Sequence, residues 1–174
     1  MKALFILAPG NFRDEEFFSP KEKLEKAGVC VTVAGLSMNE STGMLGRKTK
    51  PDMLLKDASI EDYDVLVLPG GRGSREYLID NDQVITAVRK AYEKGLIVAA
   101  ICSSCMIPAK AGIVKGKKAT CFTRPDDMQN LKNAGAQYMG EGAIVDGNLI
   151  TATGPVDSDR FADRIIEALK NRKT

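Results

Sequence analysis

The chain has 174 residues, of which 44% are hydrophobic and 28% are charged, and its 25 basic and 23 acidic residues leave a net charge of +2. This composition is typical of a folded globular protein, and the balanced charge gives no electrostatic basis for binding nucleic acid or an acidic membrane. The sequence contains no histidine, which excludes a Ser-His-Asp triad, a Cys-His dyad and a zinc site with a histidine ligand from this chain.

The alternation of short apolar runs with amphipathic segments predicts the elements of the chain in order. These are a strand over 3–9, a helix over 14–26, a strand over 29–36, an irregular hairpin or excursion over 42–58, a strand over 64–71, a helix over 81–94, a strand over 96–101, a helix over 103–112, a short strand over 118–122, a helix over 126–133, a hairpin over 143–151 and a helix over 157–171. The run 96–101 is the most apolar and is expected at the centre of the sheet. The pattern predicts a doubly wound α/β fold, a mostly parallel, flavodoxin-like sheet sandwiched by helices.

The length suits one domain over residues 1–174, which would bury about 70% of the unfolded surface without disulfides. The first apolar run ends at Pro9 and is too short for a signal peptide or a membrane span. We therefore expect a cytoplasmic protein with reduced thiols at its four cysteines, Cys30, Cys102, Cys105 and Cys121.

Functional residues are expected beyond the C-terminal ends of the central strands, where segments 8–16, 69–76 and 99–105 meet. Cys102 directly follows a buried strand and precedes a helix, with the small residues Ala100 and Ser104 two positions to either side. This is the nucleophile-elbow pattern with cysteine in place of serine. It predicts a positive φ at Cys102 and a thiol of low pKa at a helix N-terminus, whereas the alternative is a buried structural cysteine.

Two other interpretations of the cysteines are weaker. Cys102 and Cys105 form a C-x-x-C motif at a helix start, as in thiol–disulfide exchange, but no Trp or Pro flanks the pair. A zinc site made of the four cysteines is disfavoured because Cys30 lies within a strand and there is no second C-x-x-C. The glycine-rich segment 69–76 fits neither a dinucleotide fingerprint nor a P-loop, so no cofactor is expected.

The same sheet edge is expected to carry an oxyanion hole and an acid. The backbone N–H groups of Gly71, next to Gly70, and of Ser103 could hold a developing oxyanion. Glu16 lies one turn into the first helix, and burial beside Cys102 would raise the pKa of its carboxyl and let it donate a hydrogen bond to sulfur. Its neighbours Asp14 and Glu15 are expected to be solvated helix-start charges.

Taken together, these motifs resemble the DJ-1/PfpI superfamily over nearly the whole chain. The matching segments are ALFILAPG (3–10), Glu16 four residues before Pro20, YDVLVLPGG (63–71), AAIC (99–102) and GNLITATGP (147–155). The resemblance implies a class I glutamine amidotransferase-like fold with Cys102 as the reactive cysteine and Glu16 as the buried acid. This sequence also differs from the family pattern at three positions. Ser103 stands where peptidase members have a histidine, and Phe122 stands where deglycase-like members often have a histidine. Arg75 stands where the peptidase type has a glutamate.

Three functions stay open at this point. The first is glyoxalase- or deglycase-like chemistry, in which Cys102 attacks a small reactive carbonyl and Glu16 moves the proton. The second is a redox sensor or stress-protective protein that works by oxidation of Cys102, by peroxide or by a disulfide with Cys105 or Cys121. The third, an intracellular cysteine peptidase, is disfavoured because there is no histidine.

The expected partners are a small-molecule carbonyl or an oxidant, with no nucleic acid and no membrane. The resemblance also implies a homo-oligomer, a dimer or a hexamer, in which Arg47 of the irregular segment could reach a neighbouring subunit's site.

Overall fold

A seven-stranded sheet with the order β10-β11-β7-β6-β1-β2-β5 forms the centre of the computed structural model, which describes residues 1–172. Every neighbouring pair is parallel except the β10–β11 hairpin. The predicted doubly wound, mostly parallel α/β fold is therefore confirmed. The strands of this sheet are β1 (Lys2–Leu7), β2 (Cys30–Gly35), β5 (Met53–Leu54), β6 (Val65–Leu68), β7 (Ile97–Ile101), β10 (Ala143–Asp146) and β11 (Leu149–Ala152).

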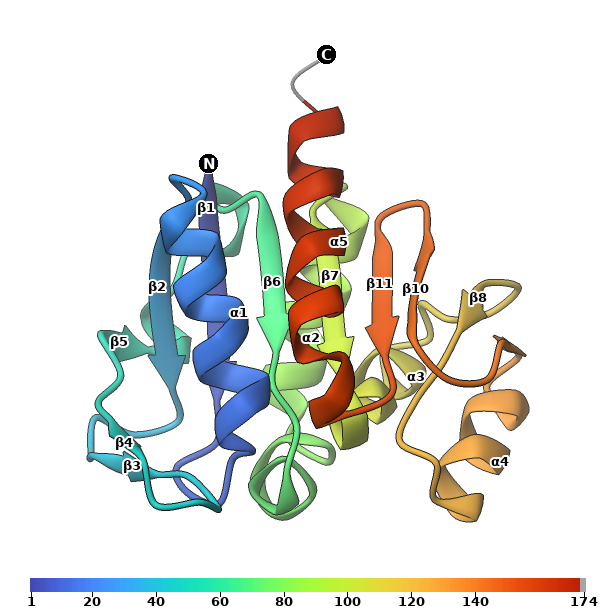
Figure 1. Cartoon of the computed structure of the whole chain (residues 1–174), viewed down its shortest axis with the longest axis horizontal. Coiled ribbons are helices and arrows are strands. Elements are labelled where there is room, and N and C mark those ends of the chain that lie inside the picture. Colours follow the sequence, from blue (N-terminus) through green and yellow to red (C-terminus); the bar gives the residue numbers. More distant parts are fainter. Residues whose placement is uncertain (173–174) are drawn as a thin grey trace.

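Helices cover both faces of the sheet, as Figure 1 shows. The helices α1 (Asp14–Lys26) and α5 (Ser158–Asn171) lie side by side on one face, and α2 (Asp82–Glu93) and α3 (Met106–Lys110) cover the other. Alternate residues of β1 serve the two cores, since Phe5 packs with the α1 and α5 side and Leu4 with the α2 and α3 side. This period of two is why a fully buried strand is apolar at every position.

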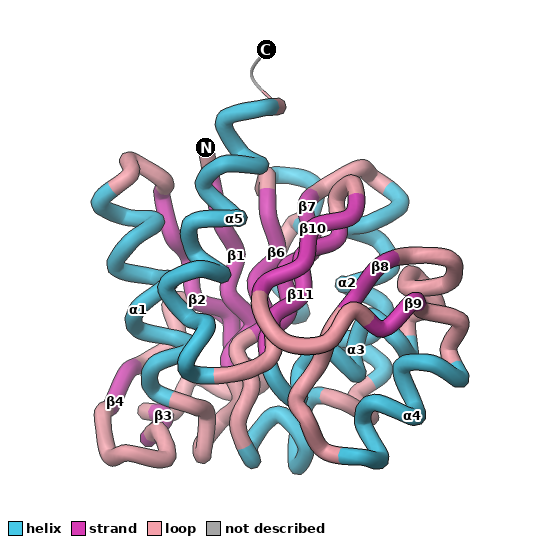
Figure 2. Tube along the Cα trace, turned by 45° about the vertical axis from the view of Figure 1, so that its right-hand side comes forward, coloured by secondary structure: helices cyan, strands magenta, loops and turns pink. Residues whose placement is uncertain are grey.

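Two small substructures flank the main sheet. The strands β3 (Ser41–Thr42) and β4 (Lys48–Thr49) form an antiparallel hairpin within the segment predicted to be irregular. On the other side, β8 (Lys118–Ala119) and β9 (Gln137–Tyr138) form a separate parallel pair joined through α4 (Pro125–Asn133), set beside α3 in Figure 2. None of the helices within residues 1–172 is long and apolar enough to span a bilayer.

The structure corrects the predicted elements at several points. The strand predicted over 118–122 has only two residues and lies outside the main sheet, because its partner is β9, which the sequence did not reveal. The helix predicted over 103–112 begins as the 3-10 turn Cys102–Cys105 and is α-helical only over Met106–Lys110. The run 96–101 is an interior strand, but β6 occupies the middle position of the sheet. A π-helical turn, Ser74–Leu78, was also not predicted.

Candidate active site

Cys102 forms the sharp turn between β7 and the following 3-10 turn, with a φ of 60°. The positive φ predicted for a nucleophile elbow is thus confirmed. The turn needs small neighbours, because a Cβ added at Gly70 would lie 2.8 Å from Cys102 Cβ and 2.7 Å from the Glu16 Oε2 atom. The Ser103 hydroxyl donates to the Gly71 carbonyl at 3.0 Å and ties the elbow to the adjacent glycine turn.

Glu16 is fully buried in the first turn of α1, at the C-terminal edge of the sheet. Its Oε2 atom accepts the backbone N–H of Gly70 at 2.9 Å, whereas its Oε1 atom has no hydrogen-bond partner among the described residues. Burial raises the pKa of Glu16 to about 7, although the Cys102 thiol, the Gly70 N–H and the charge of Arg13 all oppose the shift. The raised pKa expected from the sequence is confirmed. The interaction between the two side chains lowers the pKa of Glu16 and raises that of Cys102, so the thiol is the donor and the carboxylate the acceptor, the reverse of the direction expected.

Cys102 is only 7% exposed. Burial, and then the negative charge of Glu16, raise the pKa of Cys102 to about 12, while the backbone N–H groups of Ser103 and Gly71 oppose this shift. The low pKa predicted from the helix N-terminus is therefore wrong, because loss of hydration outweighs the two N–H donors. The resting sulfur is a thiol, and these N–H groups face a charge that would develop only on reaction.

A cavity of about 320 Å³ opens onto this sulfur. It brings together the four predicted residues Cys102, Glu16, Gly71 and Ser103. The resemblance had marked Arg75 and Phe122 as positions where family members carry other site residues, whereas Arg13, Met44, Arg72 and Pro155 were not predicted as part of the wall. The additional lining residues are Arg13, Met44, Arg72, Arg75, Phe122 and Pro155.

The other cysteines lie outside this cavity. Cys105 and Cys121 are fully buried free thiols in the core on the α2 and α3 side, whereas Cys102 belongs to the core on the α1 and α5 side. The Cys105 thiol points to the carbonyls of Ala100 and Ala152. The C-x-x-C motif therefore does not place its second thiol in the pocket with the first.

Two further predicted residues, Gly70 and Asp14, have different roles from those expected. The guanidinium of Arg47 lies 3.5 Å above the Phe18 ring and pairs with Glu22 of α1, and its predicted reach into a neighbouring subunit's site stays a prediction. Gly70 holds Glu16 and does not line the cavity. Asp14 is buried and not solvated, since its carboxylate accepts backbone N–H groups of the β3–β4 hairpin.

No group of three or more His, Cys, Asp or Glu side chains within residues 1–172 is arranged to hold a metal ion. A larger cavity of about 610 Å³ lies between the β10–β11 hairpin and α5, at the opposite end of the sheet, and no cysteine lines it. Of these two cavities, the Cys102 cavity is the one that combines a nucleophile with a buried acid.

A cysteine elbow beside a buried glutamate, at the C-terminal edge of a doubly wound sheet, defines a class of α/β proteins with a cysteine in the nucleophile position. The DJ-1/PfpI family model matches residues 1–168, and the chain belongs to this family.

Relatives match along almost all of the chain. An uncharacterised protein of Methanocaldococcus jannaschii, MJ0967, is 41% identical over 97% of this chain and 82% of its own length. Deglycase PfpI of Pyrococcus furiosus is 31% identical over 98% of this chain and 100% of its own length. The crystal structure of a ThiJ/PfpI domain protein from Brachyspira murdochii superposes with a TM-score of 0.93 at 30% identity, covering 98% of this chain and 96% of that one.

Proposed function

We propose that the protein is a cysteine-dependent enzyme with glyoxalase- or deglycase-like activity on small reactive carbonyls. One observation carries this proposal: the Cys102 thiol, at a strained elbow, shares a cavity with the buried Glu16 carboxyl and two backbone N–H groups. The deglycase names of several relatives, from Pyrococcus and Thermococcus species, support the same direction.

The first step is addition of the thiol to an aldehyde carbon. The bond between Cys102 sulfur and that carbon forms while the thiol proton passes to the Glu16 carboxylate. The electron pair of the carbonyl moves to its oxygen, where the N–H groups of Gly71 and Ser103 stabilise the negative charge. Glu16 then returns the proton to this oxygen, and the product is a neutral hemithioacetal. A carboxyl with a pKa of about 7 is suited to both directions of transfer at neutral pH.

For a 2-oxoaldehyde the same acid completes an internal redox step. Glu16 removes the proton from the hemithioacetal carbon, the hydroxyl proton of the hemithioacetal passes to the neighbouring carbonyl oxygen through the enediol, and Glu16 delivers its proton to the neighbouring carbon. The first carbon is thereby oxidised to a thioester, and the second is reduced to an alcohol. Water then hydrolyses the thioester, which releases a 2-hydroxy acid and restores the Cys102 thiol. No external oxidant or cofactor is consumed.

The test is consumption of methylglyoxal and formation of lactate by the purified protein. We expect turnover in the wild type and in Cys30→Ser, which removes an exposed thiol far from the cavity lining. Turnover should be lost in Cys102→Ser and in Glu16→Gln. The proposal would be overturned if Cys102→Ser formed lactate at the wild-type rate, or if none of the four proteins formed lactate.

A second candidate is sensing of oxidants through Cys102. The open cavity reaches its sulfur, and the N–H groups of Ser103 and Gly71 are placed to stabilise an anionic sulfinate. A related structure, at 26% identity, is that of an oxidised Toxoplasma gondii DJ-1. Intact-mass measurement after mild peroxide should show added oxygen in the wild type and none in Cys102→Ser; loss of two hydrogens would instead indicate a disulfide.

The oligomeric state and the compartment remain predictions from the sequence. We propose a homo-oligomer, a dimer or a hexamer, in the cytoplasm, to be tested by sedimentation of the purified protein and by cell fractionation. The peptidase interpretation gains no support, because Ser103 occupies the position next to the nucleophile where a histidine would be required.

A further inference from the structure

The wall of the Cys102 cavity is strongly asymmetric in charge. Three arginines line it, Arg13, Arg72 and Arg75, whereas Glu16 is the only acidic residue among the lining residues. Glu16 is fully buried beside the sulfur, and the other charged side chains that line the cavity are all cationic.

Arg13 and Arg75, here called the inner arginines, each form hydrogen bonds with a carboxylate that does not line the cavity. Glu15 accepts hydrogen bonds from Arg13 Nε at 2.8 Å and Nη2 at 3.0 Å. Asp127, only 3% exposed, binds both terminal nitrogens of Arg75, with the Nη1 contact at 3.0 Å. Such bidentate pairs fix the plane of a guanidinium and leave its remaining donors directed elsewhere.

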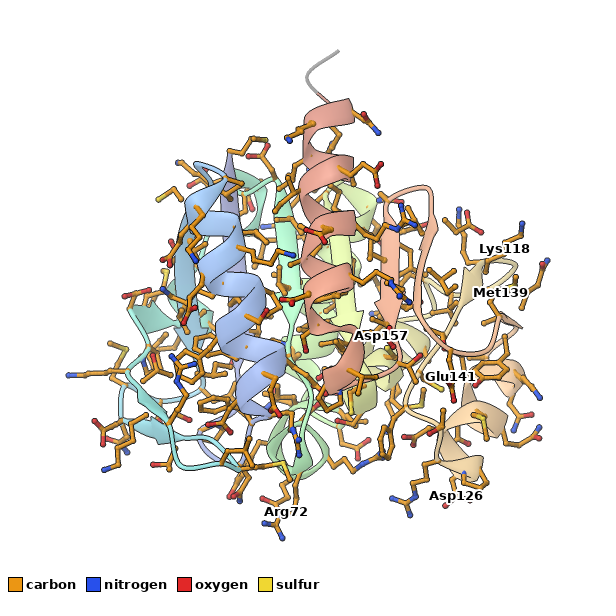
Figure 3. All side chains as sticks on the ribbon, in the orientation of Figure 1. Arg72, Lys118, Asp126, Met139, Glu141 and Asp157 are labelled. Carbon is orange, nitrogen blue, oxygen red and sulfur yellow. The ribbon has the colours of Figure 1, made fainter. Side chains whose placement is uncertain are left out.

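Both inner arginines also interact electrostatically with the reactive sulfur. The hydrogen bonds with Glu15 and with Asp127 are the main causes that raise the pKa of Arg13 and of Arg75, and a negative charge on Cys102 would add to both shifts. The Arg72 side chain is less constrained, because it is 65% exposed and its contact with Glu76 is 4.0 Å long. Figure 3 shows Arg72 at the lower surface of the molecule. The cavity therefore has two cationic groups held by carboxylates, Arg13 and Arg75, and a more exposed one, Arg72, at its mouth.

A small neutral aldehyde would use little of this arrangement. The cavity of about 320 Å³ has room for roughly ten water molecules at about 30 Å³ each, which is more than a three-carbon 2-oxoaldehyde fills. Two oriented guanidinium groups in the wall of a cavity are instead suited to binding a carboxylate or a phosphate.

We infer that the Cys102 cavity selects carbonyl compounds that carry an oxyanion, a carboxylate or a phosphate, at the end remote from the carbonyl. Arg13 and Arg75 bind this oxyanion, and Arg72 attracts it at the mouth. The inference rests on the proposed function only for the reaction at the carbonyl, because selection of anions can be measured without turnover.

The test compares alkylation of Cys102 by iodoacetate, which is anionic, and by iodoacetamide, its neutral analogue. Peptide mass spectrometry reports each cysteine separately, and the exposed Cys30 serves as an internal reference in the same sample. The iodoacetate-to-iodoacetamide rate ratio should be roughly five-fold higher at Cys102 than at Cys30, the effect of about 1 kcal/mol of charge interaction, and it should fall as salt is added.

Variants assign the effect to the arginines. Arg13→Gln should bring the ratio at Cys102 close to that at Cys30, because it removes a cationic group from the cavity. The variant should fold, because the partner Glu15 is partly exposed and can be hydrated once Arg13 is gone. Arg75→Met combined with Asp127→Asn should do the same without leaving a buried carboxylate unpaired. Arg124→Gln, which changes an exposed arginine outside the cavity lining, should leave the ratio unchanged. Equal ratios at Cys102 and Cys30 in the wild type would overturn the inference.

A binding experiment keeps this result separate from the reactivity of the thiol. Phosphate and acetate, compared at equal ionic strength, should raise the melting temperature of the wild type more than that of Arg13→Gln, and the stronger of the two identifies the preferred oxyanion. If neither reagent alkylates Cys102 but this difference in melting temperature is present, the proposed reaction fails and the anion site stands. The absence of any difference between the two proteins for either anion would refute the site itself.

Discussion

Replacing Glu16 with Gln should make the protein more stable at neutral pH and remove much of the pH dependence of its stability. The folded protein raises the pKa of this carboxyl from 4.5 to about 7. Each unit corresponds to about 1.4 kcal/mol, so ionising Glu16 in the folded state costs about 3 kcal/mol. Because the folded pKa is the higher one, the folded state binds more protons between pH 4.5 and 7, and wild-type stability falls as pH rises through this window.

Urea denaturation of wild type and Glu16→Gln at pH 4.5 and pH 8 measures this cost directly. The free energy of unfolding of the wild type, relative to Glu16→Gln, should drop by about 3 kcal/mol between the two pH values. The Gln side chain can still accept the Gly70 N–H bond, so the fold is preserved. Glu25→Gln, on the exposed side of the same helix, is the matched control and should follow the wild type. An equal pH dependence in wild type and Glu16→Gln would refute the assignment of Glu16 as a buried acid with a raised pKa.

Two further changes test the packing of the site. Gly70→Ala should lower the free energy of unfolding by about 1–3 kcal/mol in urea denaturation and slow alkylation of Cys102, because the new Cβ would meet Glu16 Oε2 and Cys102 Cβ at under 3 Å. Gly10→Ala, whose Cβ would meet no atom closer than 4.0 Å, is its control, and equal losses in the two variants would contradict the close approach at Gly70. Asp14→Asn should cost about 1–3 kcal/mol of stability and speed amide hydrogen exchange of Leu45 and Arg47, because their N–H groups lose a charged acceptor. Unchanged exchange at these two amides would show that Asp14 does not hold the hairpin.

The sheet and the elbow could be predicted from the sequence because their signals are local. The apolar runs that become β1, β6 and β7 are buried on both faces, and the small residues around Cys102 follow from the close approach of strand and helix. Glu16 could be placed because a helix that follows β1 begins at the same edge of the sheet.

What the sequence could not supply depends on long-range packing. The pKa of Cys102 follows from how completely the surrounding elements exclude water, and a helix N-terminus alone suggested the opposite direction. The role of Asp14 depends on a hairpin some thirty residues further along the chain. Arg75 reaches the cavity from an unpredicted π-helical turn and is oriented by Asp127 of α4, so the resemblance could mark its position but not its orientation or its partner.

The central claim is that Glu16 accepts the proton of the Cys102 thiol, and the pH dependence of Cys102 alkylation by iodoacetamide tests it most directly. In the wild type the rate should rise through a midpoint near pH 7, where Glu16 ionises and becomes able to take the proton. In Glu16→Gln this step should be absent, while the exposed Cys30 keeps the same profile in both proteins. The same step near pH 7 at Cys102 in Glu16→Gln would contradict the claim.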